Sequence, residues 1–193
     1  MRRVLGSTIV FALVSLTLAF ILTACGSSDQ TTAQSGSNTV LSANGTIVLS
    51  GSWSGCSGGG PYNNDTYSFS GSTFQVNQTS GHSLSNCSDA ASGSLDITIS
   101  LGTDGTKTSV DFSTDDVTPD AGPGGLSTPV TVTRVVGTVT ASSDTGMVPL
   151  GTEFKDIWYV DDRNSPLILY RGHSSTDGNG YPVHLHTVDT LTQ

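Results

Sequence analysis

The sequence predicts an all-β protein whose main domain, residues 39–193, is an antiparallel up-and-down β-barrel of about eight or nine strands. Composition is the first reason, because Gly, Ser and Thr are abundant and the helix formers Glu and Lys are few. Short runs rich in Val, Ile, Thr, Tyr and Phe also alternate with turn residues, as in a chain of hairpins. Finally, no segment keeps a helical apolar period over three turns.

The predicted strands follow one another along the chain and are separated by turns. They cover residues 46–53, 66–70, 73–79, 94–101, 107–113, 129–140, 153–160, 166–171 and 183–188. The clearest is 94–101, where Leu or Ile occupies every second position and polar residues lie between them. Gly71-Ser72 predicts a tight hairpin turn, and Gly137 predicts a bulge in the strand 129–140. Sequential hairpins leave two open sheet edges, and closure into a barrel removes them.

Residues 1–24 have the composition of an export signal. An Arg-Arg pair at positions 2 and 3 precedes a mostly apolar run without charge, which extends to Leu22. The run ends on Leu22-Thr23-Ala24-Cys25, which resembles the lipobox of bacterial lipoproteins. The resemblance implies a diacylglyceryl group on the Cys25 sulfur, cleavage on the N-terminal side of Cys25 and acylation of the new α-amine. An uncleaved transmembrane anchor is the alternative, since the run is nearly long enough to span a bilayer.

The lipoprotein resemblance also implies export and attachment to the bacterial cell envelope, with the membrane bound through the acyl chains on Cys25. Gly26 occupies the position where an Asp resembles an inner-membrane retention signal, which favours the outer membrane in a diderm host. Residues 25–38 are mainly Ser, Thr, Gln and Gly after the lipidated cysteine. They contain too few apolar residues to pack, and so predict a flexible tether.

The mature chain is strongly acidic. Removing residues 1–24 lowers the Lys and Arg count from seven to five against sixteen Asp and Glu, a formal charge of −11. Such a chain repels nucleic acid and anionic lipid, so we expect no nucleic-acid binding. Acidic residues predicted in loops at one end of the barrel form either a solvated surface or a rim that attracts cations or basic partners. They are Asp65, Asp89, Asp115, Asp116, Asp120, Asp161 and Asp162.

Cys56 and Cys87 remain as a pair once Cys25 is lipidated, and an oxidising compartment predicts a disulfide between them. Up-and-down strand order supports the pairing. The loop after the strand 46–53 and the loop that contains Cys87 then lie at the same end of the barrel. Free thiols and metal ligation are the alternatives.

Gly51-Ser52-Trp53 on the first predicted strand resembles the Gly-x-Trp motif of lipocalins and related small barrels. In that family the Trp closes the barrel floor and a late Arg packs over its ring. The resemblance therefore implies a lipocalin-like barrel in which Trp53 and Arg171 provide the barrel-floor packing. A buried Trp in some other β-barrel or sandwich is the alternative.

His184 and His186 are two residues apart on the last predicted strand, so both side chains face one side of it. Two imidazoles on one face supply half of a metal site, with His173 one loop earlier and Asp177 or Asp189 as further ligands. Exposed surface histidines are the alternative.

The sequence contains no pattern that indicates catalysis: no Gly-x-Ser-x-Gly elbow precedes a helix, and Glu153 is the only glutamate. We therefore predict a non-catalytic, lipid-anchored envelope protein without a cofactor, which binds a small or apolar ligand in the barrel or has a structural role. One alternative is an interaction or adhesion module that uses its acidic loops to bind another envelope protein. The other is a metal-binding protein or metalloenzyme that uses His184 and His186.

Overall fold

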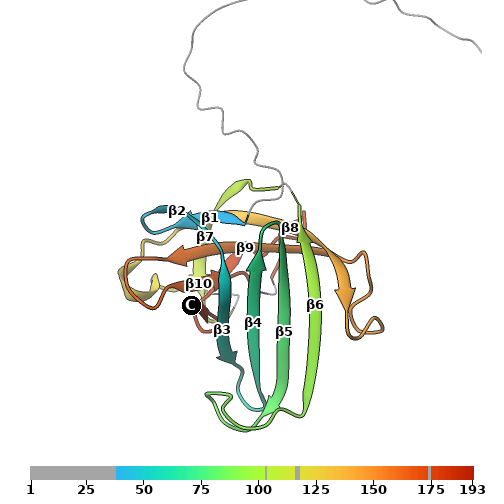
Figure 1. Cartoon of the computed structure of the whole chain (residues 1–193). Helices are drawn as coiled ribbons and strands as arrows, with labels where there is room; N and C mark the ends of the chain where they lie inside the picture. The colour runs from blue at the N-terminus through green and yellow to red at the C-terminus, as the bar shows by residue number, and fades with distance from the viewer. Residues whose placement is uncertain (1–37, 103, 116–117, 174) are drawn as a thin grey trace, which may run out of the picture. The chain divides into compact units, whose positions relative to one another are not determined.

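The computed structural model describes residues 38–193 except 103, 116–117 and 174, so the predicted signal and lipidation site at Cys25 lie outside the described residues. Within the described residues, eight antiparallel strands close into a barrel, as predicted (Figure 1). The barrel strands are β3 (Gly51–Ser57), β4 (Tyr62–Ser70), β5 (Thr73–His82), β6 (Gly93–Leu101), β8 (Val130–Ser142), β9 (Glu153–Asp161), β10 (Ile168–Arg171) and β12 (Leu191–Thr192). Their order around the barrel is β8-β6-β5-β4-β3-β12-β10-β9, and the pairing of β8 with β9 closes it.

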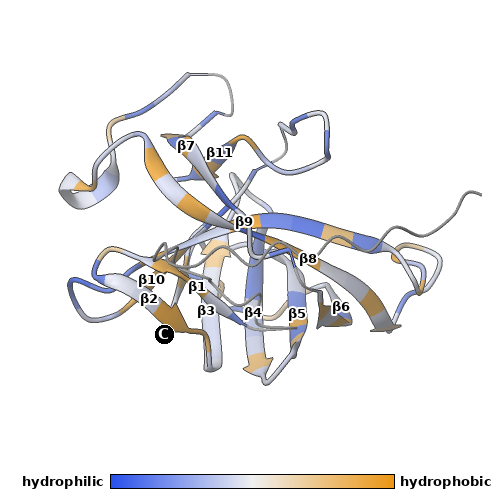
Figure 2. Ribbon diagram, turned by 90° about the horizontal axis from the view of Figure 1, so that it is seen from above, coloured by the Kyte–Doolittle hydropathy of each residue, from blue (hydrophilic) through white to orange (hydrophobic). Residues whose placement is uncertain are grey.

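In the described part of the chain, four further strands lie outside the barrel. β7 (Lys107–Ser113) pairs with the first part of β8, and β11 (His184–His186) pairs with β7 in parallel. β1 (Thr39–Ser42) and β2 (Gly45–Val48) form a hairpin that joins β9 through β1, and η1 (Pro123–Gly125) is a short 3-10 helix. Seen from above, β7 and β11 lie beyond β8 and β9, on the side away from β3–β6 (Figure 2). The predicted strand 107–113 is thus a strand but not part of the barrel wall, because β6 pairs directly with β8.

Two local predictions differ from the structure. The predicted strand 46–53 is divided into β2 and β3, which are separated at Leu49 and Ser50, and Gly51 begins β3 with φ +67° in the left-handed region that glycine adopts readily. The bulge predicted at Gly137 lies further along β8, opposite the step between Thr98 and Ile99. Gly137 instead permits close packing, since a Cβ at this position would lie 2.6 Å from Ile99 Cγ2.

Aromatic side chains form the core inside the barrel. The rings of Tyr67, Phe69, Phe74, Phe154 and Trp158 contact one another with centroids 5.3–6.4 Å apart. Buried aliphatic residues of β6, β8 and β10 pack around them. This part of the barrel interior is therefore filled by the protein's own side chains.

A second apolar core lies against the outer face of the barrel wall, where β7 and β11 cover it. Phe112, Val132, Ile157 and Leu185 are fully buried there. β9 is therefore buried on both faces: Trp158 belongs to the barrel core, and its neighbour Ile157 belongs to the outer core. Burial on two faces accounts for the nearly continuous apolar run in this strand. No helix in the described ranges has the length and apolar character needed to cross a membrane.

Candidate functional site

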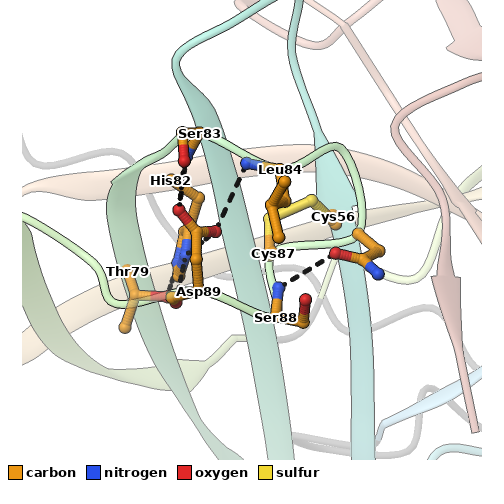
Figure 3. Close-up of a disulfide and its surroundings, with 9 residues drawn as sticks. Cys56, Thr79, His82, Ser83, Leu84, Cys87, Ser88 and Asp89 are labelled. Atoms are coloured by element: carbon orange, nitrogen blue, oxygen red, sulfur yellow. Dashed lines mark hydrogen bonds and ion pairs between the residues drawn. A yellow bond between two sulfur atoms is a disulfide. The ribbon is translucent and has the colours of Figure 1, made fainter.

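The predicted disulfide is present and joins Cys56 near the end of β3 to Cys87 in the β5–β6 connection, with Cα atoms 5.8 Å apart. Strand order does bring both cysteines to one end of the barrel. Asp89 organises the connection, because its carboxylate accepts hydrogen bonds from the Ser83 amide at 2.7 Å and the Ser83 hydroxyl at 2.6 Å (Figure 3). These donors hold the pKa of Asp89 well below its usual value.

A cleft of about 450 Å³ lies beside this disulfide. The end of β3, the start of β4, the β5–β6 connection and the segment after β11 all contribute to it. The lining residues are Cys56, Ser57, Gly58, Tyr62, Ser85, His186, Val188 and Asp189. Because Cys56 is one of them, the disulfide fixes the β5–β6 connection next to the cleft. The lining combines an aromatic ring and an aliphatic side chain with hydroxyl, imidazole and carboxylate groups.

One border of the cleft contains a cluster of two histidines and an aspartate. His173, His186 and Asp189 each offer one ligand atom, and the three atoms lie within 4.8 Å of one another. Asp189 Oδ2 is 3.3 Å from His186 Nδ1 and 3.8 Å from His173 Nε2. The two imidazole rings are stacked, with centroids 4.1 Å apart and planes inclined by 18°. Nitrogen and oxygen donors of this kind are the ligands that Zn²⁺ takes in proteins.

His186 is held firmly in this cluster. Its side chain is 6% exposed, and its Nε2 lies 3.1 Å from the Thr114 carbonyl oxygen. A carbonyl only accepts hydrogen bonds, so Nε2 carries the proton and Nδ1 is the nitrogen with the lone pair. Nδ1 accepts a hydrogen bond from the Asp189 backbone amide at 3.0 Å. The parallel pairing of β11 with β7 positions this histidine, because it aligns His186 with Ser113.

The structure brings together only part of the predicted metal set. His186 is grouped with His173 and Asp189, two residues that the sequence indicates as further ligands, whereas His184 is not in the group. His184 aligns with Asp111 of β7, and its Nδ1 is buried without a hydrogen-bond partner in the described structure. Asp177, the other suggested ligand, accepts a hydrogen bond from Arg134 at 2.6 Å.

Trp53 and Arg171, the residues predicted to pack together on the barrel floor, have different polar partners in the structure. Trp53 is buried, and its indole N–H donates to the Ser50 carbonyl at 3.1 Å. The Arg171 guanidinium lies over the Tyr67 ring, 5.0 Å from its centroid, and donates to the Tyr67 hydroxyl at 2.7 Å. It also donates to Asp65 at 3.1 Å. Arg171 thus forms the centre of a polar network inside the barrel.

Asp156 is a buried carboxylate that is not among the predicted site residues. Its oxygens accept hydrogen bonds from the Ile157 amide at 2.7 Å, the Gly172 amide at 2.9 Å and the Trp158 indole at 2.7 Å. Burial outweighs these donors and raises the pKa of Asp156 to about 6. A signal does exist in the sequence, because Asp156 interrupts the inward-facing apolar series of β9, between Phe154 and Trp158.

At least one residue of the predicted acidic rim does not lie at the rim. Asp65 lies inside the barrel, where Gln78 and Arg171 donate to it. Asp161 is paired with Arg163 at 2.8 Å, so its charge is compensated locally. Asp116 lies outside the described residues.

Comparison with known proteins assigns the chain to no family, since no family model, no curated protein and no solved structure matches it.

Proposed function

We propose that this chain is an exported, lipid-anchored cell-envelope protein that binds a small ligand, without catalysis, in the cleft beside the Cys56–Cys87 disulfide. The observation that carries the proposal is the cleft itself. Its volume of about 450 Å³ is in the range of small-molecule sites, and its lining mixes apolar surface with a few polar groups. The disulfide restrains its lining segments, which lowers the entropy that a ligand must remove on binding.

The cleft is a better supported ligand site than the barrel interior. Five aromatic rings fill the core between β4, β5 and β9, and the Arg171 network lies beside them. An apolar ligand in that position requires displacement of these rings. The lipobox resemblance at Leu22-Thr23-Ala24-Cys25 supports the envelope location, and a disulfide suits an oxidising compartment.

Native mass spectrometry tests the cleft as the binding site. The full chain is extracted from membranes of its own host in mild detergent and compared with Val188→Arg, which adds bulk and charge at a cleft residue that is 60% exposed. Met147→Arg is the control, because Met147 is also exposed and does not line the cleft. We expect a retained ligand mass in wild type and Met147→Arg, and its loss in Val188→Arg. Equal retention in both variants, or no retained mass in wild type, contradicts the proposal.

A further inference from the structure

We propose that His173, His186 and Asp189 bind a divalent transition-metal ion, with Zn²⁺ the best match, at the border of the cleft. The inference rests on the proposed function because it takes the same cleft as the binding site, and it adds a metal ion at the border of that cleft. The set of two imidazole nitrogens and one carboxylate oxygen is one that Zn²⁺ uses with an open fourth position.

The distances between the donor atoms favour a tetrahedral ion. Metal–ligand bonds of about 2.0–2.2 Å separate the ligand atoms of a tetrahedral zinc site by about 3.4 Å. His186 Nδ1 and Asp189 Oδ2 are already 3.3 Å apart, and His173 Nε2 and Asp189 Oδ2 are 3.8 Å apart. Two of the three ligand–ligand distances therefore need little adjustment.

The hydrogen bonds around His186 prepare it as a ligand. Donation from Nε2 to the Thr114 carbonyl is the outer-shell contact that metal-binding histidines commonly make, and it directs the lone pair of Nδ1 towards Asp189. Two adjustments accompany binding. Nδ1 gives up its hydrogen bond from the Asp189 amide, and the His173 ring turns out of the stack so that its nitrogen faces the ion. The His173 side chain is 36% exposed, which leaves it room to turn.

The surroundings of the cluster also favour a cation. The mature chain carries a formal charge of −11, which raises the local concentration of cations. His186 and Asp189 line the cleft, and its other lining residues offer no free thiol, imidazole or carboxylate because Cys56 is in the disulfide. The fourth position of the ion therefore faces a space that water or a small exogenous donor can enter.

Metal titration tests this site directly. The full chain is purified in detergent without an oligohistidine tag, stripped with a chelator and titrated with Zn²⁺ by calorimetry, and Co²⁺ absorption spectra report the coordination. We expect one ion per chain. His173→Ala should lower the Zn²⁺ affinity by at least about tenfold, the effect that even loss of an outer-shell partner produces. His184→Ala, two residues from His186 on the same strand, is the matched control and should bind normally.

Two further variants keep the test decisive. Asp189→Asn retains the shape of the side chain and removes its charge, and should also weaken binding, with near-UV circular dichroism showing that the fold is kept. Cys25→Ser should bind normally, which excludes an unlipidated thiol as the ligand. Absence of saturable binding, or equal weakening by His173→Ala and His184→Ala, overturns the metal site. If Val188→Arg still abolishes retention of an organic mass in that case, the proposed function stands and only the metal inference fails.

Discussion

Arg171 places a guanidinium group inside the barrel, where it is paired with Asp65 and stacked on Tyr67. The side chains of the pair are only 13% and 12% exposed. Removing one partner of a buried ion pair leaves the other charge without compensation, which costs more than the pair itself contributes. The lipocalin resemblance implies that Arg171 packs over the ring of Trp53, whereas the guanidinium lies over the ring of Tyr67. The identity of the ring, however, depends on strand positions that local pattern does not encode.

Arg171→Met should therefore lower the free energy of unfolding by about 3–5 kcal/mol, because Asp65 then remains buried and unpaired. Urea denaturation followed by tryptophan fluorescence measures the change. Lys155→Met is the control, since it removes a surface ion pair with the exposed Glu153 and should cost about 1 kcal/mol or less. If Arg171→Met and Lys155→Met lower the free energy of unfolding by similar amounts, the buried pair of Arg171 and Asp65 does not have the stabilising role described above.

Asp156 predicts a pH dependence of stability. Burial raises its pKa from 3.8 to about 6, so the folded state binds the proton more tightly than the unfolded state. The stability from this group is fully present below about pH 4 and is lost as pH rises through about 6, a change of about 3 kcal/mol. Urea denaturation from pH 4 to pH 7 should show this decrease in wild type and in Asp144→Asn, an exposed control. Asp156→Asn should lack it, and an unchanged pH slope in that variant refutes the assignment.

At the scale of elements, period-2 alternation is sufficient to predict the strands that face the core on one side. The run 107–113 matches β7, and 94–101 differs from β6 by one residue. The pattern does not indicate that β7 leaves the barrel, because strand partners are set by long-range packing. The pattern does not predict β12, because its two residues are too few to show alternation. The placement of β11 beside β7 was equally hidden, and it is this pairing that aligns His186 with Ser113.

Gly137 is required where β8 pairs with the end of β6, opposite Leu101. A Cβ there would lie 2.6 Å from Ile99 Cγ2 and 2.9 Å from the Ser100 carbonyl oxygen. Gly137→Ala should lower the unfolding free energy by about 1–3 kcal/mol through overpacking. Gly178→Ala is the control because a Cβ at Gly178 has no neighbour within 4 Å. Urea denaturation midpoints measure the stability of both variants. If Gly137→Ala is as stable as wild type, the close contact between Gly137 and Ile99 is excluded.

The Cys56–Cys87 disulfide connects β3 to the β5–β6 connection across a sequence separation of 31 residues. In the chain-entropy model a loop of this length contributes about 3–4 kcal/mol. The double variant Cys56→Ser/Cys87→Ser should lose stability of this size, and amide hydrogen exchange should increase most in residues 83–92. If exchange rises uniformly over the barrel instead, the disulfide does not act locally on the cleft.

The described part of the chain is a barrel with an aromatic core, and the proposed membrane attachment at Cys25 lies outside the described residues. The barrel and its disulfide follow from alternation, composition and cysteine count, which are visible in the sequence. The cleft does not, because it forms where three segments far apart in the chain meet. Because aromatic side chains fill the part of the barrel interior between β4, β5 and β9, we propose ligand contact at the disulfide end of the domain.

We propose that the chain is a lipoprotein, and the intact mass of the protein extracted from its host's membranes tests this proposal. Under denaturing conditions we predict a chain that begins at Cys25, heavier than the polypeptide 25–193 by a diacylglyceryl group with or without one further acyl chain. The Cys25→Ser variant should lack this added mass. An unmodified chain that still begins at Met1 refutes the lipid anchor and supports an uncleaved transmembrane anchor instead.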